Sequence, residues 1–249
     1  MKEILKAQKI SKVYQDQVGY RINLLHDINF NICENEFVTI LAPIGSGKTS
    51  LLKIIADLDK PTSGIVESEL NQRIYIPSKP SSFPWLNVEE NISFNSNLSS
   101  EEIQNIIDEI GLHGYEYHFP NNKSEGFRFR ISLGRALANN PEVIILDEPF
   151  NNLNTATRKE IYTLVKTISK KTNVPFLLGT TNITEAIFLS DKIYLMKKNP
   201  GEILEVVNVE LPKKRDIEII ESDEFLSIRN KIEDILKEKT SKVLYNFSI

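Results

Sequence analysis

Residues 42–49 read APIGSGKT, a glycine-rich stretch between a predicted apolar strand and a predicted helix. Glycines let the backbone curl so that successive N–H groups point at phosphate oxygens, and the start of the helix adds a partial positive charge. Lys48 supplies a full charge to the terminal phosphates, and the hydroxyl of Thr49 suits a Mg²⁺ ligand. The phosphate loop predicted in this way consists of Pro43, Ile44, Gly45, Ser46, Gly47, Lys48, Thr49 and Ser50.

The loop departs from the usual pattern, G-x-x-x-x-G-K-[ST], at its first position, which is Ala42. An alanine there requires a negative φ or modest strain, but it removes no phosphate contact. The alternative to a phosphate loop is a turn rich in Gly and Ser before a helix. An acidic strand end elsewhere in the chain weakens that alternative.

This acidic strand end is VIILDEP at residues 143–149. Ligands bind at the carboxyl edge of open α/β sheets. Asp147 is therefore expected to hold Mg²⁺ directly or through its other ligands, and Glu148 to polarise the attacking water. The alternative is a strand that ends in solvated acids, which is weakened because Pro149 ends the strand sharply and no basic residue lies nearby in sequence. The two stretches together predict a nucleoside-triphosphate site.

The composition indicates a chain that folds around a real core. Of 249 residues, 41% are hydrophobic and 26% charged, enough for one large α/β domain or two small ones. Thirty Lys and Arg against 34 Asp and Glu give a net charge of −4, which argues against non-specific nucleic-acid binding. Cys33, the only cysteine, is expected to be small core filler in a reducing compartment. The start of the chain has no apolar signal segment and no apolar stretch is long enough for a membrane span, so any membrane contact is expected to be peripheral.

Hydrophobic periodicity predicts alternating strands and helices. Residues 85–140 are mostly helical in pattern, with a helix start at Ser99, and residues 211–239 indicate a charged helical appendage. The alternation in the second half implies a parallel sheet with covering helices. Strands are expected at 4–10, 26–32, 37–42, 65–68, 73–76, 143–147, 176–180 and 192–196, helices at 49–58, 155–171 and 183–190, and a turn at 61–64.

Further motifs, in their order and spacing, resemble the ATP-binding subunit of an ABC transporter over nearly the whole chain, and more narrowly that of nitrate-, sulfonate- and taurine-type importers. Lys12-Val13-Tyr14 resembles the segment whose aromatic ring stacks on adenine; a core position is the alternative for Tyr14. The other resembling segments are PWLNVEEN at 84–91, GRAL through Pro141 at 134–141, EAIFLSD at 185–191, and LP at 211–212 with the charged tail.

The resemblance implies an α/β fold of the P-loop NTPase type, with a parallel core sheet, an N-terminal antiparallel β subdomain and an inserted helical subdomain. It implies one ATP-binding domain over 1–249, with the helical subdomain at about 85–140 and a C-terminal helical appendage at about 211–249. Trp85 is expected to pack at the base of the helical subdomain, and the alternative is a contact with a partner subunit.

The resemblance also implies ligands and partners. ATP and Mg²⁺ are the implied ligands, with Thr49 and Asp147 at the metal and Lys48, Asp147 and Glu148 as catalytic residues. The implied partners are an integral membrane permease subunit and a second ATP-binding subunit, with no nucleic acid. The chain is then expected to be cytoplasmic and peripheral on the inner face of the cell membrane.

In this family two domains sandwich two ATP molecules, each between the phosphate loop of one chain and the signature segment of the other. The signature, usually L-S-G-G-Q, is KSEGF at 123–127. Ser124 and Gly126 keep a hydroxyl and a close backbone approach to ATP. Glu125 would bring a carboxylate towards the triphosphate, at a cost of roughly several kcal/mol, unless Arg128 or Arg130 neutralises it and it points to solvent. Both outcomes remain open.

Three more family positions are altered. Ser78 replaces the usual glutamine, Asn154 the usual aspartate, and Thr181 the usual switch histidine. Threonine can neither carry a proton near neutral pH nor present a charged donor, and loss of one such contact typically costs about a hundredfold to a thousandfold in rate. No histidine lies near position 181 in sequence: the three are His26, His113 and His118.

ATP binding is therefore expected to survive better than turnover. The first interpretation is an importer subunit with slow hydrolysis. The second is a non-catalytic subunit that binds ATP as a structural or regulatory half of a heterodimer, which the altered positions favour and the retained Glu148 disfavours. A soluble ABC-type protein that acts on nucleic acid or ribosomes is the weaker interpretation, because those proteins are usually tandem. The solute stays open, with small anions suggested by analogy alone, and so does homodimer or heterodimer.

Overall fold

The computed structural model describes residues 2–15, 19–79 and 81–245, with side chains as far as Lys239. Along the chain its elements are β1 (Glu3–Gln15), β2 (Arg21–Cys33), β3 (Phe37–Leu41), α1 (Lys48–Ile55), β4 (Ser63–Ser68), β5 (Arg73–Ile76), α2 (Val88–Ser93), α3 (Ser100–Glu109), α4 (Glu125–Ala138), β6 (Val143–Asp147), α5 (Thr155–Thr172), β7 (Phe176–Thr180), α6 (Ile183–Leu189), β8 (Lys192–Lys197), β9 (Glu202–Asn208), the 3-10 helix η1 (Ile217–Glu221) and α7 (Asp223–Tyr245).

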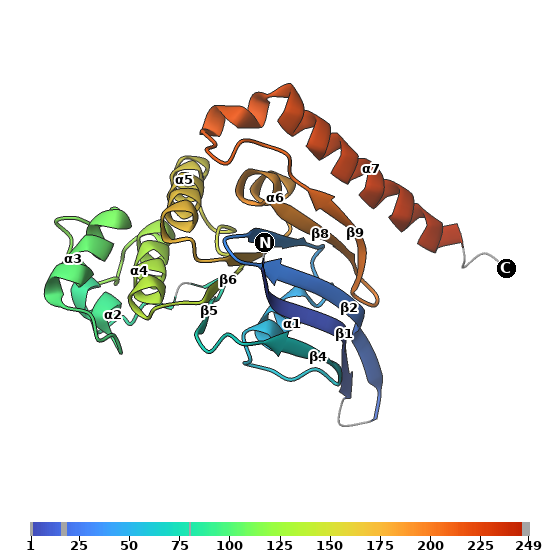
Figure 1. Ribbon diagram of the computed structural model, residues 1–249, viewed down its shortest axis with the longest axis horizontal. Helices are drawn as coiled ribbons and strands as arrows, with labels where there is room; N and C mark the ends of the chain where they lie inside the picture. The colour runs from blue at the N-terminus through green and yellow to red at the C-terminus, as the bar shows by residue number, and fades with distance from the viewer. Residues whose placement is uncertain (1, 16–18, 80, 246–249) are drawn as a thin grey trace.

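A six-stranded sheet in the order β5-β6-β7-β3-β8-β9 forms the centre of the molecule (Figure 1). The first five strands are parallel, as predicted, and β9 pairs antiparallel with β8 at the edge. β3, β6 and β7 are buried along their whole length, as strands covered on both faces must be. The sequence analysis missed β9, because most of its residues are only half-buried and show no clear alternation.

A second, antiparallel sheet in the order β2-β1-β4 confirms the expected N-terminal β layer. The turn predicted at 61–64 is wrong in its second half, because Ser63 and Gly64 already belong to β4. Gly64 has a φ of 90°, and a Cβ there would lie 2.3 Å from the carbonyl oxygen of Lys9. The glycine therefore permits a close approach of two strands rather than a turn.

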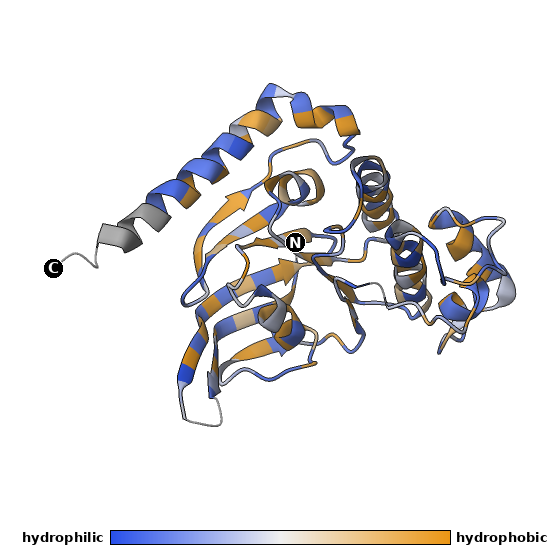
Figure 2. Cartoon of the chain, turned by 180° about the vertical axis from the view of Figure 1, so that it is seen from behind, coloured by the Kyte–Doolittle hydropathy of each residue, from blue (hydrophilic) through white to orange (hydrophobic). Residues whose placement is uncertain are grey.

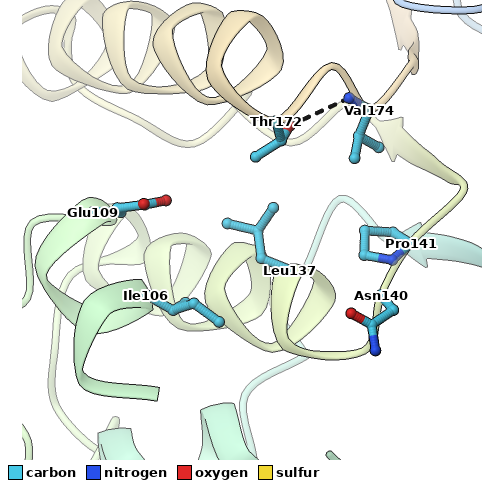
Figure 3. Close-up of a pocket in the computed structure, with 7 residues that line it drawn as sticks. All are labelled: Ile106, Glu109, Leu137, Asn140, Pro141, Thr172 and Val174. Carbon is cyan, nitrogen blue, oxygen red and sulfur yellow. Dashed lines mark hydrogen bonds between the residues drawn. The ribbon is translucent and has the colours of Figure 1, made fainter. Parts of the chain in front are cut away.

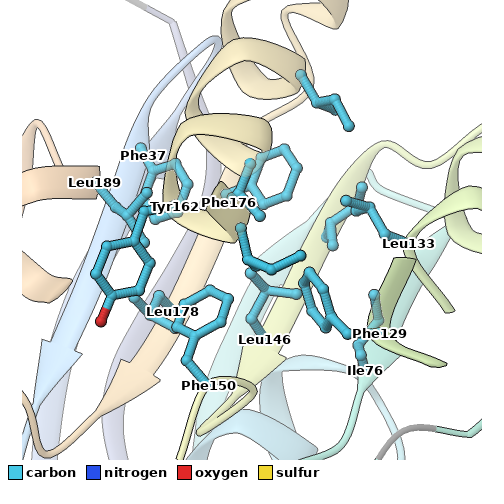
Figure 4. Close-up of a cluster of buried hydrophobic side chains, with 14 of the residues drawn as sticks. Phe37, Ile76, Phe129, Leu133, Leu146, Phe150, Tyr162, Phe176, Leu178 and Leu189 are labelled. Atoms are coloured by element: carbon cyan, nitrogen blue, oxygen red, sulfur yellow. The ribbon is translucent and has the colours of Figure 1, made fainter. Parts of the chain in front are cut away.

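Two hydrophobic cores fill the two faces of the central sheet. On one face, Phe37 stacks on Phe176 with ring centroids 5.2 Å apart (Figure 4). Helices α4, α5, α6 and α7 contribute buried residues to the same core. On the other face, α1 and the antiparallel sheet cover the alternate strand residues, such as Ile40 and Ile145. The central strands are packed on both faces up to the edge where they end, so side chains at that edge are held in place.

Helices α2, α3 and α4 form a lobe beside the central sheet (Figure 1). Ser99 caps α3 in a capping box with Glu102, which confirms the predicted helix start. Loops at 94–98 and 110–124 interrupt the predicted helical region. The lobe therefore has two well-capped short helices and one longer helix that reaches the core.

The C-terminal segment folds back over the sheet through η1 and α7. Phe225 and Ile232 of α7 are fully buried, while the helix carries hydrophilic residues along its outer side (Figure 2). Lys239 donates to the carbonyl of Leu204 and pairs with Glu205 of β9. Residues 246–249 of the predicted appendage lie outside the described residues. Among the helices that the structure describes, none combines the length and the apolar character that a membrane crossing requires.

Candidate nucleotide site

The loop between β3 and α1 has the backbone expected of a phosphate loop. Gly47 precedes α1 with a φ of 87°, and a Cβ there would lie 2.7 Å from the Cδ2 of Leu25, so only glycine fits. Ala42 keeps the negative φ expected for it, and its N–H donates to the carbonyl of Thr180. The exposed loop residues are Pro43, Ile44, Gly45 and Thr49, and the buried ones are Ser46 and Lys48.

Lys48 and Glu148 meet although a hundred residues separate them. The Lys48 Nζ donates to the Glu148 Oε1 at 2.6 Å, and the two side chains are 8% and 11% exposed. No basic residue lies near Glu148 in sequence, but α1 brings Lys48 to the carboxyl end of β6 in space. Glu148 itself has a φ of 46°, an uncommon conformation that clusters at functional sites.

Asp147 ends β6 beside this ion pair. Its Oδ2 accepts a hydrogen bond from the hydroxyl of Tyr75 at 2.8 Å. Burial and the charge of Asp147 both raise the pKa of Tyr75 above its ordinary range, so the phenol stays a donor. Tyr75 had no role in the sequence analysis, and only its place on the strand beside β6 reveals it.

Three buried oxygens at this edge have no hydrogen-bond partner among the described residues: the Ser46 Oγ, the Asp147 Oδ1 and the Glu148 Oε2. Buried polar atoms are almost always paired, so unpaired ones at a single edge indicate a place for a ligand. Mg²⁺ prefers oxygen ligands such as hydroxyl and carboxylate groups. The residues present thus fit a Mg²⁺ ion together with a phosphate group.

The loop after β7, which carries Thr181, is held by a closed set of hydrogen bonds. The Asn182 N–H donates to the Thr180 Oγ1 at 3.0 Å, the Thr180 hydroxyl donates to the Glu185 carboxylate, and the Glu185 N–H donates to the Asn182 Oδ1 at 3.2 Å. Thr181 remains exposed. The loop is thus fixed, and it presents Thr181 at the position where the resemblance implies a histidine.

Glu185 is a buried carboxylate for which the sequence analysis proposed no role. It is 1% exposed and also accepts from the Tyr162 hydroxyl at 2.7 Å. Burial raises the pKa of Glu185, and the hydrogen bonds from Thr180 and Tyr162 oppose that rise. The sequence signal that could have revealed this buried carboxylate was a single acid next to the apolar residues of EAIFL at 185–189. Glu185 ties the loop of Thr181 to α5.

Tyr14 lies beside the first turn of α1. Tyr14 is 44% exposed, so the alternative that it is a core residue is wrong. Its hydroxyl lies 3.4 Å from the Ser50 Oγ and 3.4 Å from the Asp59 Oδ2. An accessible ring next to the phosphate loop is available for stacking on a base.

The signature residues lie apart from the phosphate loop of the same chain. Ser124 caps α4, and α4 belongs to the helical lobe, whereas α1 lies under the central sheet (Figure 1). Glu125 pairs with Arg128 at 3.7 Å, which is one of the two outcomes left open. Arg130 does not take part, because its guanidinium pairs with Glu160 instead.

The other altered positions have local roles. Asn154 caps α5 by accepting from the Thr157 N–H at 2.9 Å, and Ser78 is exposed. Trp85 is 70% exposed, so the prediction that it packs at the base of the lobe is wrong. Phe83 takes the packing position, and Trp85 stacks on its outer side with centroids 5.4 Å apart. Cys33, expected as core filler, is only half-buried at the end of β2.

A hollow of about 350 Å³ lies between the C-terminal ends of α4 and α5 (Figure 3). Pro141 and Val174 in its lining precede β6 and β7, so the hollow is at the amino ends of the parallel strands. The carboxylates of Asp147 and Glu148 are at the opposite edge. The hollow is therefore separate from the candidate site and marks the seam between the helical lobe and the core.

Comparisons with known proteins agree with this geometry. The family model described as ABC transporter matches residues 25–151. The uncharacterized ABC transporter ATP-binding protein MJ0412 of Methanocaldococcus jannaschii is 34% identical over 98% of this chain and 95% of its own. The aliphatic sulfonates import ATP-binding protein SsuB of Bacillus cereus is 35% identical over 92% and 94%. A solved dimer of the ATP-binding cassette MJ0796 bound to ADP and Pi is similar with a TM-score of 0.72 and 28% identity, over 84% of this chain and all of that one.

Proposed function

This chain belongs to the ABC transporter family of ATP-binding proteins, and from that premise we propose that it is the ATP-binding subunit of an importer. We propose further that it binds Mg·ATP well and hydrolyses it slowly. The relatives named for sulfonate import support a small organic or inorganic anion as the solute of the whole transporter.

The observation that carries the proposal is the buried edge where Lys48, Asp147 and Glu148 meet, with oxygens left unpaired. Main-chain N–H groups of the phosphate loop and the Lys48 ammonium would hold the phosphates. Thr49 and Asp147 would hold Mg²⁺, which when bound offsets phosphate charge. Each of these groups is retained, so the capacity to bind ATP should be retained as well.

Slow hydrolysis follows from what surrounds that edge. The exposed Thr181 hydroxyl stands where a proton carrier is usual. None of the three histidines belongs to the loop of Thr181, because His26 lies on β2, and His113 and His118 lie in the loop between α3 and α4. Glu148 is the base for the attacking water in this proposal, but it is engaged by Lys48 until a phosphate takes Lys48 over. The missing proton carrier reduces turnover, while the Lys48–Glu148 ion pair competes with the phosphates without removing any group that binds them.

A second ATP-binding subunit and a membrane permease are the proposed partners. Ser124 and Gly126 would face the triphosphate held by the other subunit, and the pairing of Glu125 with Arg128 limits the repulsion. The exposed rings of Trp85 and Phe94 would contact the permease. The chain would then be cytoplasmic and peripheral on the inner face of the membrane, as one domain over 1–249 with a helical subdomain at about 85–140 and an appendage at about 211–249.

The altered residues also support a second candidate, a non-catalytic half of a heterodimer. It is favoured by the same exposed Thr181, together with Ser78 and Asn154. A subunit of this kind would gain nothing from Glu148, so the Glu148→Gln variant separates the two candidates. Loss of residual turnover in Glu148→Gln supports the slow enzyme, and unchanged turnover supports the binder.

Steady-state phosphate release at saturating Mg·ATP tests the proposal. We expect the turnover number of the wild type to stay well below roughly 1–10 per second, the lower part of the range typical of enzymes. Lys48→Ala is the reference for contaminating activity, because it removes the only loop cation. A wild-type turnover within that range would contradict slow hydrolysis.

A further inference from the structure

We propose that Lys12 and Asp59 are positioning residues for the nucleobase: they hold the ring of Tyr14 against α1, the helix that begins in the phosphate loop. The inference rests on the proposed function, because it assumes that the phosphates of ATP occupy residues 43–50. It adds the side chains that give Tyr14 a fixed place and the consequence for affinity.

Lys12 is anchored on the side of α1 away from the phosphates. Its Nζ donates to the Asp59 Oδ1 at 2.7 Å and to the Lys60 carbonyl at 2.6 Å, and its side chain is 12% exposed. The same ammonium lies 5.2 Å from the centroid of the Tyr14 ring, within the range of a cation–π contact. One face of the ring is therefore occupied by Lys12, and a base has the other face available.

The hydroxyl end of Tyr14 is held as well. It lies 3.4 Å from the Asp59 Oδ2 and from the Ser50 Oγ, and Ser50 is in the first turn of α1. The Asp59 N–H in turn bonds to the carbonyl of Lys53 on that helix. The hydrogen bond from Lys12 lowers the pKa of Asp59, so this carboxylate remains an acceptor across neutral pH. The Tyr14 ring, the Lys12–Asp59 ion pair and α1 are thus connected to one another by these contacts.

A ring placed in advance costs less freedom when a ligand binds than a ring that must be ordered. Loss of a complete base–aromatic stack lowers affinity by about fivefold to 150-fold. Loss of its support should cost part of that, about fivefold to tenfold for ATP. A ligand without a base should lose nothing, because neither Lys12 nor Asp59 bonds to the phosphate loop itself.

Calorimetric titration with Mg·ATP and, separately, with Mg²⁺ and inorganic tripolyphosphate tests the inference. Lys12→Met should weaken ATP about fivefold to tenfold and leave tripolyphosphate unchanged. Lys12→Arg, which keeps the charge and the pairing with Asp59, should restore most of the ATP affinity. Lys6→Met, at an exposed lysine of the same strand, is the matched control and should bind both ligands like the wild type.

A double-mutant cycle separates positioning from a general structural role. In a Tyr14→Ala background, Lys12→Met should cost little further ATP affinity, because its effect passes through the ring. Equal losses for ATP and tripolyphosphate, an unchanged ATP affinity in Lys12→Met, or full additivity with Tyr14→Ala would each overturn the inference. Asp59→Asn provides the same test if Lys12→Met does not fold. If the wild type binds neither ligand, the proposed function itself is wrong.

Discussion

Replacing Glu148 with glutamine should tighten ATP binding about fivefold. In the structure the Glu148 carboxylate holds the Lys48 Nζ at 2.6 Å in a buried ion pair, so the phosphates must compete for the same ammonium. A hydrogen bond between charged groups contributes about 1.5–3 kcal/mol net. The glutamine carbonyl still accepts from the ammonium but carries no charge, so we take about half of that contribution as lost. The competition then falls by roughly 1 kcal/mol, which is a factor of about five.

Equilibrium dialysis with labelled ATP and Mg²⁺ would measure the effect. Glu160→Gln is the control, because it makes the same change of charge at a side chain that is 68% exposed on α5, and its affinity should equal that of the wild type. An affinity of Glu148→Gln equal to or weaker than that of the wild type would refute the reasoning, since Lys48 would then not be restrained by Glu148.

Three further predictions concern turnover, pH and packing. Thr181→His should raise turnover by up to about a hundredfold, measured as phosphate release; no increase would mean that another defect limits the site. Burial, with the nearby charge of Arg215, lowers the pKa of Lys166 to about 8 from 10.5. Between these two pKa values the unfolded chain binds a proton that the folded chain has lost, so the free energy of unfolding rises with pH. Urea unfolding should show this rise as about 2 kcal/mol between about pH 7.5 and 9.5 for the wild type relative to Lys166→Met. Gly126→Ala should cost about 1–3 kcal/mol of unfolding free energy, because its Cβ would lie 2.5 Å from the Thr157 Cγ2; adding Thr157→Ser, which removes that methyl group, should restore most of the loss, and a persistent loss would place the clash elsewhere.

The sequence was sufficient for the elements whose signals are local. The apolar runs at 143–147 and 176–180 became β6 and β7 with the predicted bounds, because strands covered on both faces need continuous hydrophobic residues. Ser99 and Glu102 gave the start of α3 through a capping box that four residues encode. The edge strand β9 lacked such a signal, since its stability comes from pairing with β8.

The parts of the site that depend on contacts between distant segments were not predictable. The Lys48–Glu148 ion pair joins residues a hundred positions apart, and only the parallel pairing of the central strands brings them together. The hydrogen bonds of Glu185 to Thr180 and Tyr162 similarly link β7, α5 and α6. Trp85 was predicted to pack at the base of the helical lobe, but Phe83, two residues before it, occupies that contact.

The central claim is that this chain holds a triphosphate with its loop amides, Lys48 and Mg²⁺ while it cleaves that triphosphate slowly. A single calorimetric titration with Mg·ATP reports both properties, because binding appears as a saturating heat and hydrolysis as a continuing one. We predict saturation near one nucleotide per chain, followed by a nearly flat baseline. A titration that shows no binding heat, or one dominated by steady hydrolysis at roughly 1–10 per second, would contradict the account.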